Sequence, residues 1–228
     1  LNNSAVATYN ATSNGLLFTG SAAIFNNLPG ATFDAQNDTN VTFNGGSPQF
    51  NNDGTFIKSG GAGTTSLTSG LAFVNDGSVD VQSGTLELRA GATHSGSFDC
   101  TGATLSFNGG TQDLSAVQTL TGTNVVFDSG TVNLPGGYNV TGNTTVAGAT
   151  ANFTGSVTSL GQLVLTSGTI NLSNTEGVAT QSTCTQSGAT LTGSSDVTVT
   201  GVFNWTGGTQ TGTGATNAQG GLNLTGSS

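Results

Sequence analysis

Charged side chains are scarce in this chain. Only 6% of its 228 residues are Asp, Glu, Lys or Arg, against about a quarter in ordinary soluble domains. Lys58 and Arg89 are the only Lys and Arg residues, and the formal net charge is −9. This excludes a basic groove for nucleic acid, and Ser, Thr, Asn and Gly must keep the surface hydrated instead.

Other residue types are also rare: the chain has no Met, one His and two Cys. Two cysteines are too few for a disulfide framework, and one His leaves no spare for a catalytic triad or a zinc cluster. His94 lies in the string GATHSG, which predicts a solvated turn. No apolar run approaches the roughly 18 residues of a membrane-spanning helix. We predict no cofactor, no metal and no membrane span.

The chain begins at Leu1 with no Met anywhere. We expect it to be a segment of a longer product, with any secretion signal or anchor outside the segment.

A repeat near twenty residues fills the rest of the sequence. SGTVNL at 129–134 returns as SGTINL at 167–172. One series of glycine-led strings has spacings of 20, 18, 20, 20 and 20, and a second, offset series has spacings of 18, 20, 20 and 19. The first series begins at Gly110, Gly130, Gly148, Gly168, Gly188 and Gly208, and the second at Gly84, Gly102, Gly122, Gly142 and Gly161.

Within each string, apolar residues alternate with polar ones, as in Val132 and Leu134. Such alternation over four to six residues predicts short strands with one buried face. Short strands at this spacing indicate an all-β fold, a parallel β-helix (β-solenoid) of about 19–25 residues per coil and roughly eleven coils. Equivalent residues of adjacent coils then lie about 4.8 Å apart, so that Leu134 stacks on Phe153 and Phe107 on Phe127.

The first third of the chain has the same pattern with a longer period. Phe25, Phe50 and Phe73 each open a Phe-x-Asn string, and they lie 25 and 23 residues apart. We predict one solenoid over 1–228, with longer coils and larger turns in 1–80 and regular coils of about 20 residues in 81–228. The Gly-, Ser- and Thr-rich stretch 59–70 is expected to be a loop that leaves the coil.

The strings FNNDGTFIKSG, FVNDGSVDVQSGTLEL, SGTVNLPGGYNVTGNTTV and GVFNWTGGTQTGTG resemble the repeats of large bacterial surface and secreted proteins. These are adhesins of the filamentous-haemagglutinin and autotransporter-passenger type. The resemblance covers essentially the whole chain and carries no enzyme signature. It implies a right-handed β-helix, secretion, and a role in adhesion, biofilm matrix or surface fibres.

Two pairs of carboxylates are the candidates for chemistry. Asp80 and Asp99 occupy the same site in adjacent coils, about 5 Å apart, and Asp53 and Asp76 occupy equivalent Asn-Asp-Gly turns. A glycosidase needs two carboxylates about 5–10 Å apart. The favoured interpretation is that both pairs are outward residues that recur with the repeat. Trp205, in FNWTGG, is a candidate for stacking on a sugar, although packing of this ring in a strand is favoured.

The two cysteines give a test of the coil count. Cys100 aligns with Val81, and Cys184 follows Leu165 by 19 residues in the inward register. They are 84 residues apart, which is about four coils or roughly 19 Å along the axis, beyond the roughly 7 Å limit between the Cα atoms of a disulfide. We predict no bridge between them.

Both ends of the chain, LNNSAVATY and GLNLTGSS, have strand-like alternation. Uncapped strand edges pair with other chains. The favoured function is therefore that of a non-enzymatic extracellular or cell-surface structural protein, a repeat unit or subunit of a fibre whose copies stack head to tail. The alternatives are an adhesin stalk that presents a carbohydrate-binding patch and a polysaccharide-degrading β-helix enzyme.

Overall fold

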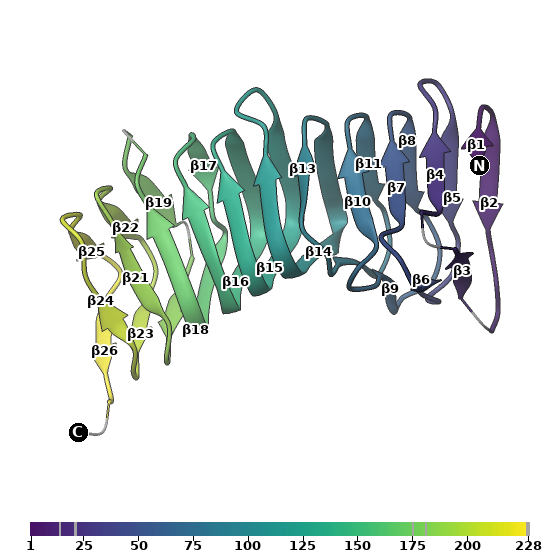
Figure 1. The fold of residues 1–228 in the computed structure, drawn as a ribbon. Helices are drawn as coiled ribbons and strands as arrows, with labels where there is room; N and C mark the ends of the chain where they lie inside the picture. Colours follow the sequence, from purple (N-terminus) through teal and green to yellow (C-terminus); the bar gives the residue numbers. More distant parts are fainter. Residues whose placement is uncertain (14, 21, 175, 181, 227–228) are drawn as a thin grey trace.

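The computed structural model is a β-solenoid in which the chain winds through eleven stacked coils (Figure 1). It describes residues 1–13, 15–20, 22–174, 176–180 and 182–226. Within these ranges every element is a β-strand and every strand pairing is parallel. The termini lie at opposite ends of the stack. The predicted fold class is confirmed.

Each coil has three strands, and equivalent strands stack into three faces. Four long strands run round the corners and contribute to more than one face: β14 (Ser97–Leu114), β15 (Thr119–Leu134), β16 (Gly137–Phe153) and β18 (Gln162–Leu172). The first face also contains β1 (Asn2–Asn3), β4 (Ile24–Asn27), β7 (Gln49–Asn52), β10 (Ala72–Asn75), β13 (Ala92–His94), β21 (Thr190–Gly193) and β24 (Thr209–Gln210).

The other two faces are built in the same way. The second contains β2 (Val6–Tyr9), β5 (Thr32–Ala35), β8 (Thr55–Lys58), β11 (Ser78–Val81), β17 (Val157–Ser159), β19 (Val178–Thr180), β22 (Val197–Val199) and β25 (Thr216–Ala218). The third contains β3 (Leu16–Thr19), β6 (Val41–Asn44), β9 (Thr64–Leu67), β12 (Thr85–Leu88), β20 (Cys184–Gln186), β23 (Phe203–Trp205) and β26 (Leu222–Leu224).

The strand registers confirm the repeat. Thr131 pairs with Thr150, and Thr150 with Thr169, so SGTVNL and SGTINL lie two coils apart. The predicted pairs Leu134 with Phe153 and Phe107 with Phe127 are both present. The Phe107 and Phe127 rings stack at 5.8 Å between centroids. In the first coils Phe50 pairs with Phe25 on one side and Phe73 on the other, at the predicted spacings.

Glycine is required at the corners because adjacent coils approach closely there. Gly130 has φ of +81°, which L side chains rarely adopt, and a Cβ at this position would lie 2.2 Å from the carbonyl oxygen of Gly110 in the coil below. Gly130 is therefore a corner residue at which a larger side chain would be strained.

Two local expectations are wrong. The stretch 59–70 is not a loop, because β9 lies within it and pairs with β12. Thr65 is buried there, and its hydroxyl donates to the Asn37 carbonyl, so a Ser/Thr-rich string fills an inward position. His94 is not in a solvated turn either: it ends β13 and is fully buried.

Candidate functional site

The N-terminal end of the stack is open and apolar. β1, β2 and β3 pair only with β4, β5 and β6 of the following coil. Leu1, Val6, Leu17 and Ile24 expose 84%, 70%, 52% and 45% of their surfaces. Leu1 and Ile24, with the half-buried Phe18, line a hollow of about 340 Å³. The first coil therefore leaves an apolar surface and a set of unpaired strand edges.

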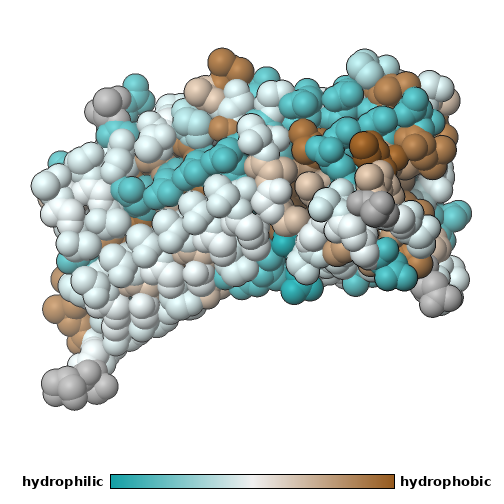
Figure 2. All heavy atoms as spheres, in the orientation of Figure 1, coloured by the Kyte–Doolittle hydropathy of each residue, from teal (hydrophilic) through white to brown (hydrophobic). Residues whose placement is uncertain are grey.

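The C-terminal end is open in the same way. β24, β25 and β26 pair only with the preceding β21, β22 and β23. Leu222 and Leu224 continue the inward rows of the third face, and they expose 49% and 64% of their surfaces because no further coil of the described residues, which end at 226, covers them. Figure 2 shows hydrophobic atoms at both ends of the stack.

Trp205 belongs to this end of the core. It pairs with the buried Gln186 and with Leu224. Its indole stacks on the ring of Phe203, with 6.3 Å between the ring centroids and 2° between the ring planes. The ring therefore packs against the core in the inward register of β23, and its exposed part faces the C-terminal end.

Asp80 and Asp99 pair in register in adjacent coils, as predicted. Each carboxylate accepts hydrogen bonds from its own coil: Asp80 from Gln82 Nε2 at 2.6 Å, and Asp99 from the backbone and hydroxyl of Thr101 at 2.9 and 2.6 Å. Lys58 is not beside this pair, since it points into the core next to Val81. These contacts stabilise strand ends.

Asp53 and Asp76 lie in equivalent turns, where each backbone N–H donates to an Asn carbonyl one coil below, at 2.9 Å. Both side chains are exposed. Asp76 accepts hydrogen bonds from the backbone and hydroxyl of Ser95 in the next coil. The structure thus places one acidic pair on a strand and the other in a turn, each in a separate row.

A polar ladder inside the core was not predicted. The buried amides of Asn27, Asn52 and Asn75 follow Asn3, and the Nδ2 atoms of Asn3, Asn27 and Asn52 each donate to the Oδ1 of the next Asn at 2.7–2.8 Å. Each Nδ2 also donates to a backbone carbonyl at 2.8–3.0 Å. The signal was present in the Phe-x-Asn strings, whose Asn shares the inward face with Phe.

His94 and Gln112 terminate this ladder. The Asn75 backbone N–H donates to His94 Nδ1 at 3.3 Å, and His94 Nε2 lies 2.7 Å from Gln112 Oε1. Burial lowers the pKa of His94, although its bond to Gln112 and the charges of Asp76 and Asp113 oppose this shift. The one histidine is therefore a neutral core residue and not an exposed base.

Lys58 is the second unpredicted polar group of the core. Its side chain is fully buried in the inward register, and its Nζ donates to Asp38 Oδ1 at 3.1 Å and to the Gly60 carbonyl. Burial raises the pKa of Asp38, but hydrogen bonds from the Gly63 backbone and Lys58 outweigh this, and the pKa is lowered overall. The pair links the end of β8 to the segment around Asp38 in the preceding coil.

Both cysteines are free and buried, which confirms the absence of a bridge. Burial raises the pKa of Cys100 to about 11 and that of Cys184 to about 12. Cys184 is inward, as predicted, but its partner in the coil below is Leu163 and not Leu165. Neither thiol is placed to act as a nucleophile.

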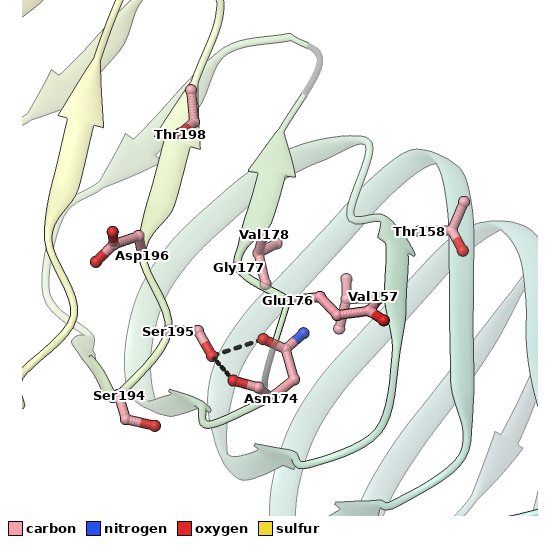
Figure 3. A pocket seen from close by; sticks show the side chains of 10 residues that line it. All are labelled: Val157, Thr158, Asn174, Glu176, Gly177, Val178, Ser194, Ser195, Asp196 and Thr198. Carbon is pink, nitrogen blue, oxygen red and sulfur yellow. Dashed lines mark hydrogen bonds between the residues drawn. The ribbon is translucent and has the colours of Figure 1, made fainter.

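A hollow of about 670 Å³ lies at one corner of the later coils (Figure 3). Five residues, 173–177, separate Leu172 from Val178, whereas three, 194–196, separate their partners Gly193 and Val197. The longer corner brings Asn174 and Glu176 to the hollow, beside Ser195 and Asp196 of the next coil. The only sequence signal for it is a local extension of the repeat.

Within the part of the chain that the structure describes, no three His, Cys, Asp or Glu side chains group closely enough to hold a metal ion. The same residues form no helix able to cross a membrane. Comparison of the chain with models of protein families, with curated proteins and with solved structures finds no match.

Proposed function

We propose that this protein is a non-enzymatic, extracellular structural protein, and that its solenoid is a repeat unit or subunit of a cell-surface or extracellular fibre. Copies stack head to tail in this fibre. The observation that supports the proposal is that the three faces run without interruption from β1, β2 and β3 to β24, β25 and β26, whose edges and apolar side chains can pair with a further coil, either of a longer chain or of another copy. The likeness of the repeats to bacterial surface proteins supports the location.

The two ends are compatible with each other. The inward row of the third face begins at Leu16 and ends at Leu224, and parallel strands run in the same direction at both ends. A second copy can therefore place its β1, β2 and β3 on β24, β25 and β26 and continue all three faces. This contact covers Leu222 and Leu224 with the apolar hollow around Phe18. Because the contact is heterologous and does not close, it generates a filament.

Electron microscopy and sedimentation velocity test the proposal. The wild-type chain is expected to form filaments with an axial repeat of about 50 Å, taken as eleven coils with the spacing of parallel strands. The double variant Leu222→Lys/Leu224→Lys is expected to remain monomeric, because a buried unpaired ammonium opposes the contact. Val117→Lys is the matched control, since Val117 is 84% exposed but lies on a corner away from both ends.

Two results would overturn the proposal. One is a wild-type chain that stays monomeric at high concentration. The other is an end variant that forms the same filaments as the wild type and the Val117 control.

A further inference from the structure

The corner hollow of Figure 3 contains a buried amide that lacks a partner on one side. Asn174 is 7% exposed, and its Nδ2 makes no hydrogen bond. Figure 3 shows this nitrogen pointing away from Ser195, toward the side of the hollow that Glu176 lines. Buried amide groups without partners are uncommon and cost about 1–3 kcal/mol, so this one indicates a place for an absent hydrogen-bonding group.

The contacts of Ser195 show that one polar atom of the amide lacks a partner in either orientation of the amide. Its Oγ lies 2.6 Å from both the backbone oxygen and the Oδ1 of Asn174. One hydroxyl proton serves only one of these acceptors. If the amide turns over, Nδ2 donates to Ser195 Oγ and the hydroxyl donates to the backbone oxygen, so that Oδ1 faces the hollow. In either orientation, one polar atom of the amide faces the hollow and has no partner.

The charges around the hollow exclude an anionic ligand. Glu176 and Asp196 both line it and are exposed, and none of the ten residues that line it is Lys, Arg or His. A bare divalent cation is also poorly served, because Ca²⁺ takes about 6–8 oxygen ligands and Asp196 Oδ1 already accepts a bond from the Ala215 backbone at 2.7 Å. A neutral ligand that carries hydroxyl groups can pair with both the amide and the carboxylates of this hollow.

A hydroxyl both donates and accepts, so it pairs with either end of the Asn174 amide and also donates to the Glu176 carboxylate. The half-buried Val157 supplies an apolar surface for the C–H face of a sugar ring. The volume of about 670 Å³ lies within the usual size range of small-molecule sites. We propose that this corner hollow binds a neutral saccharide through the free end of the Asn174 amide and the Glu176 carboxylate.

The site lies on the side of the solenoid and does not depend on end-to-end assembly. It is tested by NMR titration of the ¹⁵N-labelled full chain, with every variant carrying Leu222→Lys/Leu224→Lys so that the chain remains monomeric, against glucose, galactose, N-acetylglucosamine, maltose and cellobiose, and separately against CaCl₂. At least one saccharide is expected to shift the side-chain NH₂ signals of Asn174 saturably. Glu176→Gln should weaken its binding about tenfold, as expected when a hydrogen bond to a charged acceptor becomes one to a neutral acceptor.

Asp53→Asn is the matched control, because it removes the same charge from an exposed turn outside the hollow. Its affinity for the saccharide should equal that of the wild type. The proposal is overturned if no saccharide shifts the Asn174 signals, or if Glu176→Gln binds as tightly as the control. It is also overturned if only CaCl₂ produces the saturable shift.

Discussion

Replacement of Asn52 by Ala tests the internal amide ladder. Asn52 is fully buried and lies in the middle of the ladder. Its Oδ1 accepts from Asn27 Nδ2 at 2.7 Å, and its Nδ2 donates to Asn75 Oδ1 at 2.8 Å and to the Ser78 carbonyl at 2.9 Å. Asn52→Ala removes all three bonds and leaves Asn27 Nδ2, Asn75 Oδ1 and the Ser78 carbonyl with one partner fewer each.

The expected cost follows from these three bonds. A buried hydrogen bond contributes about 0.5–1.5 kcal/mol net, and a buried polar group left unpaired costs about 1–3 kcal/mol. Three bonds together with one acceptor left unpaired, Asn75 Oδ1, sum to about 2.5–7.5 kcal/mol for Asn52→Ala, a large part of the roughly 5–15 kcal/mol by which folded domains are stable.

Asn51→Ala is the control, because Asn51 precedes Asn52 on β7 but points outward. Its Nδ2 donates to Asn26 Oδ1 at 2.8 Å in a row that is partly exposed to water. Its loss should cost less than about 1 kcal/mol. Urea unfolding followed by far-ultraviolet circular dichroism measures both variants. If the two midpoints fall by the same amount, the inner ladder contributes no more than the outer one and the reasoning is refuted.

Three further predictions concern the other buried polar groups. Because burial lowers the pKa of His94, the unfolded chain takes up a proton that the folded chain resists, so stability should be full above the unfolded pKa of about 6.5 and fall as the pH drops below it. This is measured by urea midpoints between pH 7.5 and 5.5. Asp38→Asn removes the charged partner of the buried Lys58 ammonium, which keeps only the Gly60 carbonyl and a neutral amide oxygen as acceptors, so it should lower the free energy of unfolding by more than Lys58→Met, which leaves the exposed Asp38 carboxylate solvated; urea unfolding measures both. Cys100 and Cys184, whose pKa values are raised by burial, should react with a thiol reagent at pH 8 only after denaturation.

Each of these predictions has its own contrary outcome. In the first, His94→Gln should abolish the decline, and an unchanged decline would assign it to other groups. In the second, an equal loss of unfolding free energy in Lys58→Met and Asp38→Asn would show that the ion pair itself stabilises the fold. In the third, fast labelling of either cysteine in the native chain would contradict its burial.

The architecture was predictable because the apolar alternation and the corner glycines repeat with one period. Val132 and Leu134 point inward and Gly130 needs a positive φ, so each repeat specifies the same strand and the same corner. Parallel stacking then brings together residues one period apart. Asp80 and Asp99 were aligned in this way from the sequence alone.

The polar interior was not predictable from the same pattern. Sequence alternation separates inward from outward positions only where the inward residue is apolar, and the inward Asn52, Lys58 and His94 do not satisfy that rule. Their burial depends on partners one coil away, namely another Asn, Asp38 and Gln112. The hollow at Asn174 depends on an extension of one corner. This extension interrupts the repeat, so the periodic pattern that predicted the strands does not predict it.

The amide ladder also has a role that apolar rows do not fill. In the first coils, Phe and Asn alternate on the inward face, as in Phe50 and Asn52. A slip of two residues between coils keeps every side chain on its own face, so burial of apolar surface alone opposes it weakly. The same slip places Asn52 against a Phe, breaks both of its links in the ladder and leaves buried amides unpaired. In other systems, buried polar groups specify register through the cost of leaving them unpaired. Here the ladder ends at His94, which is where the period shortens. Thr55 and Ser78, which pair in adjacent coils, are 23 residues apart, whereas Ser78 and Ser97 are 19 apart.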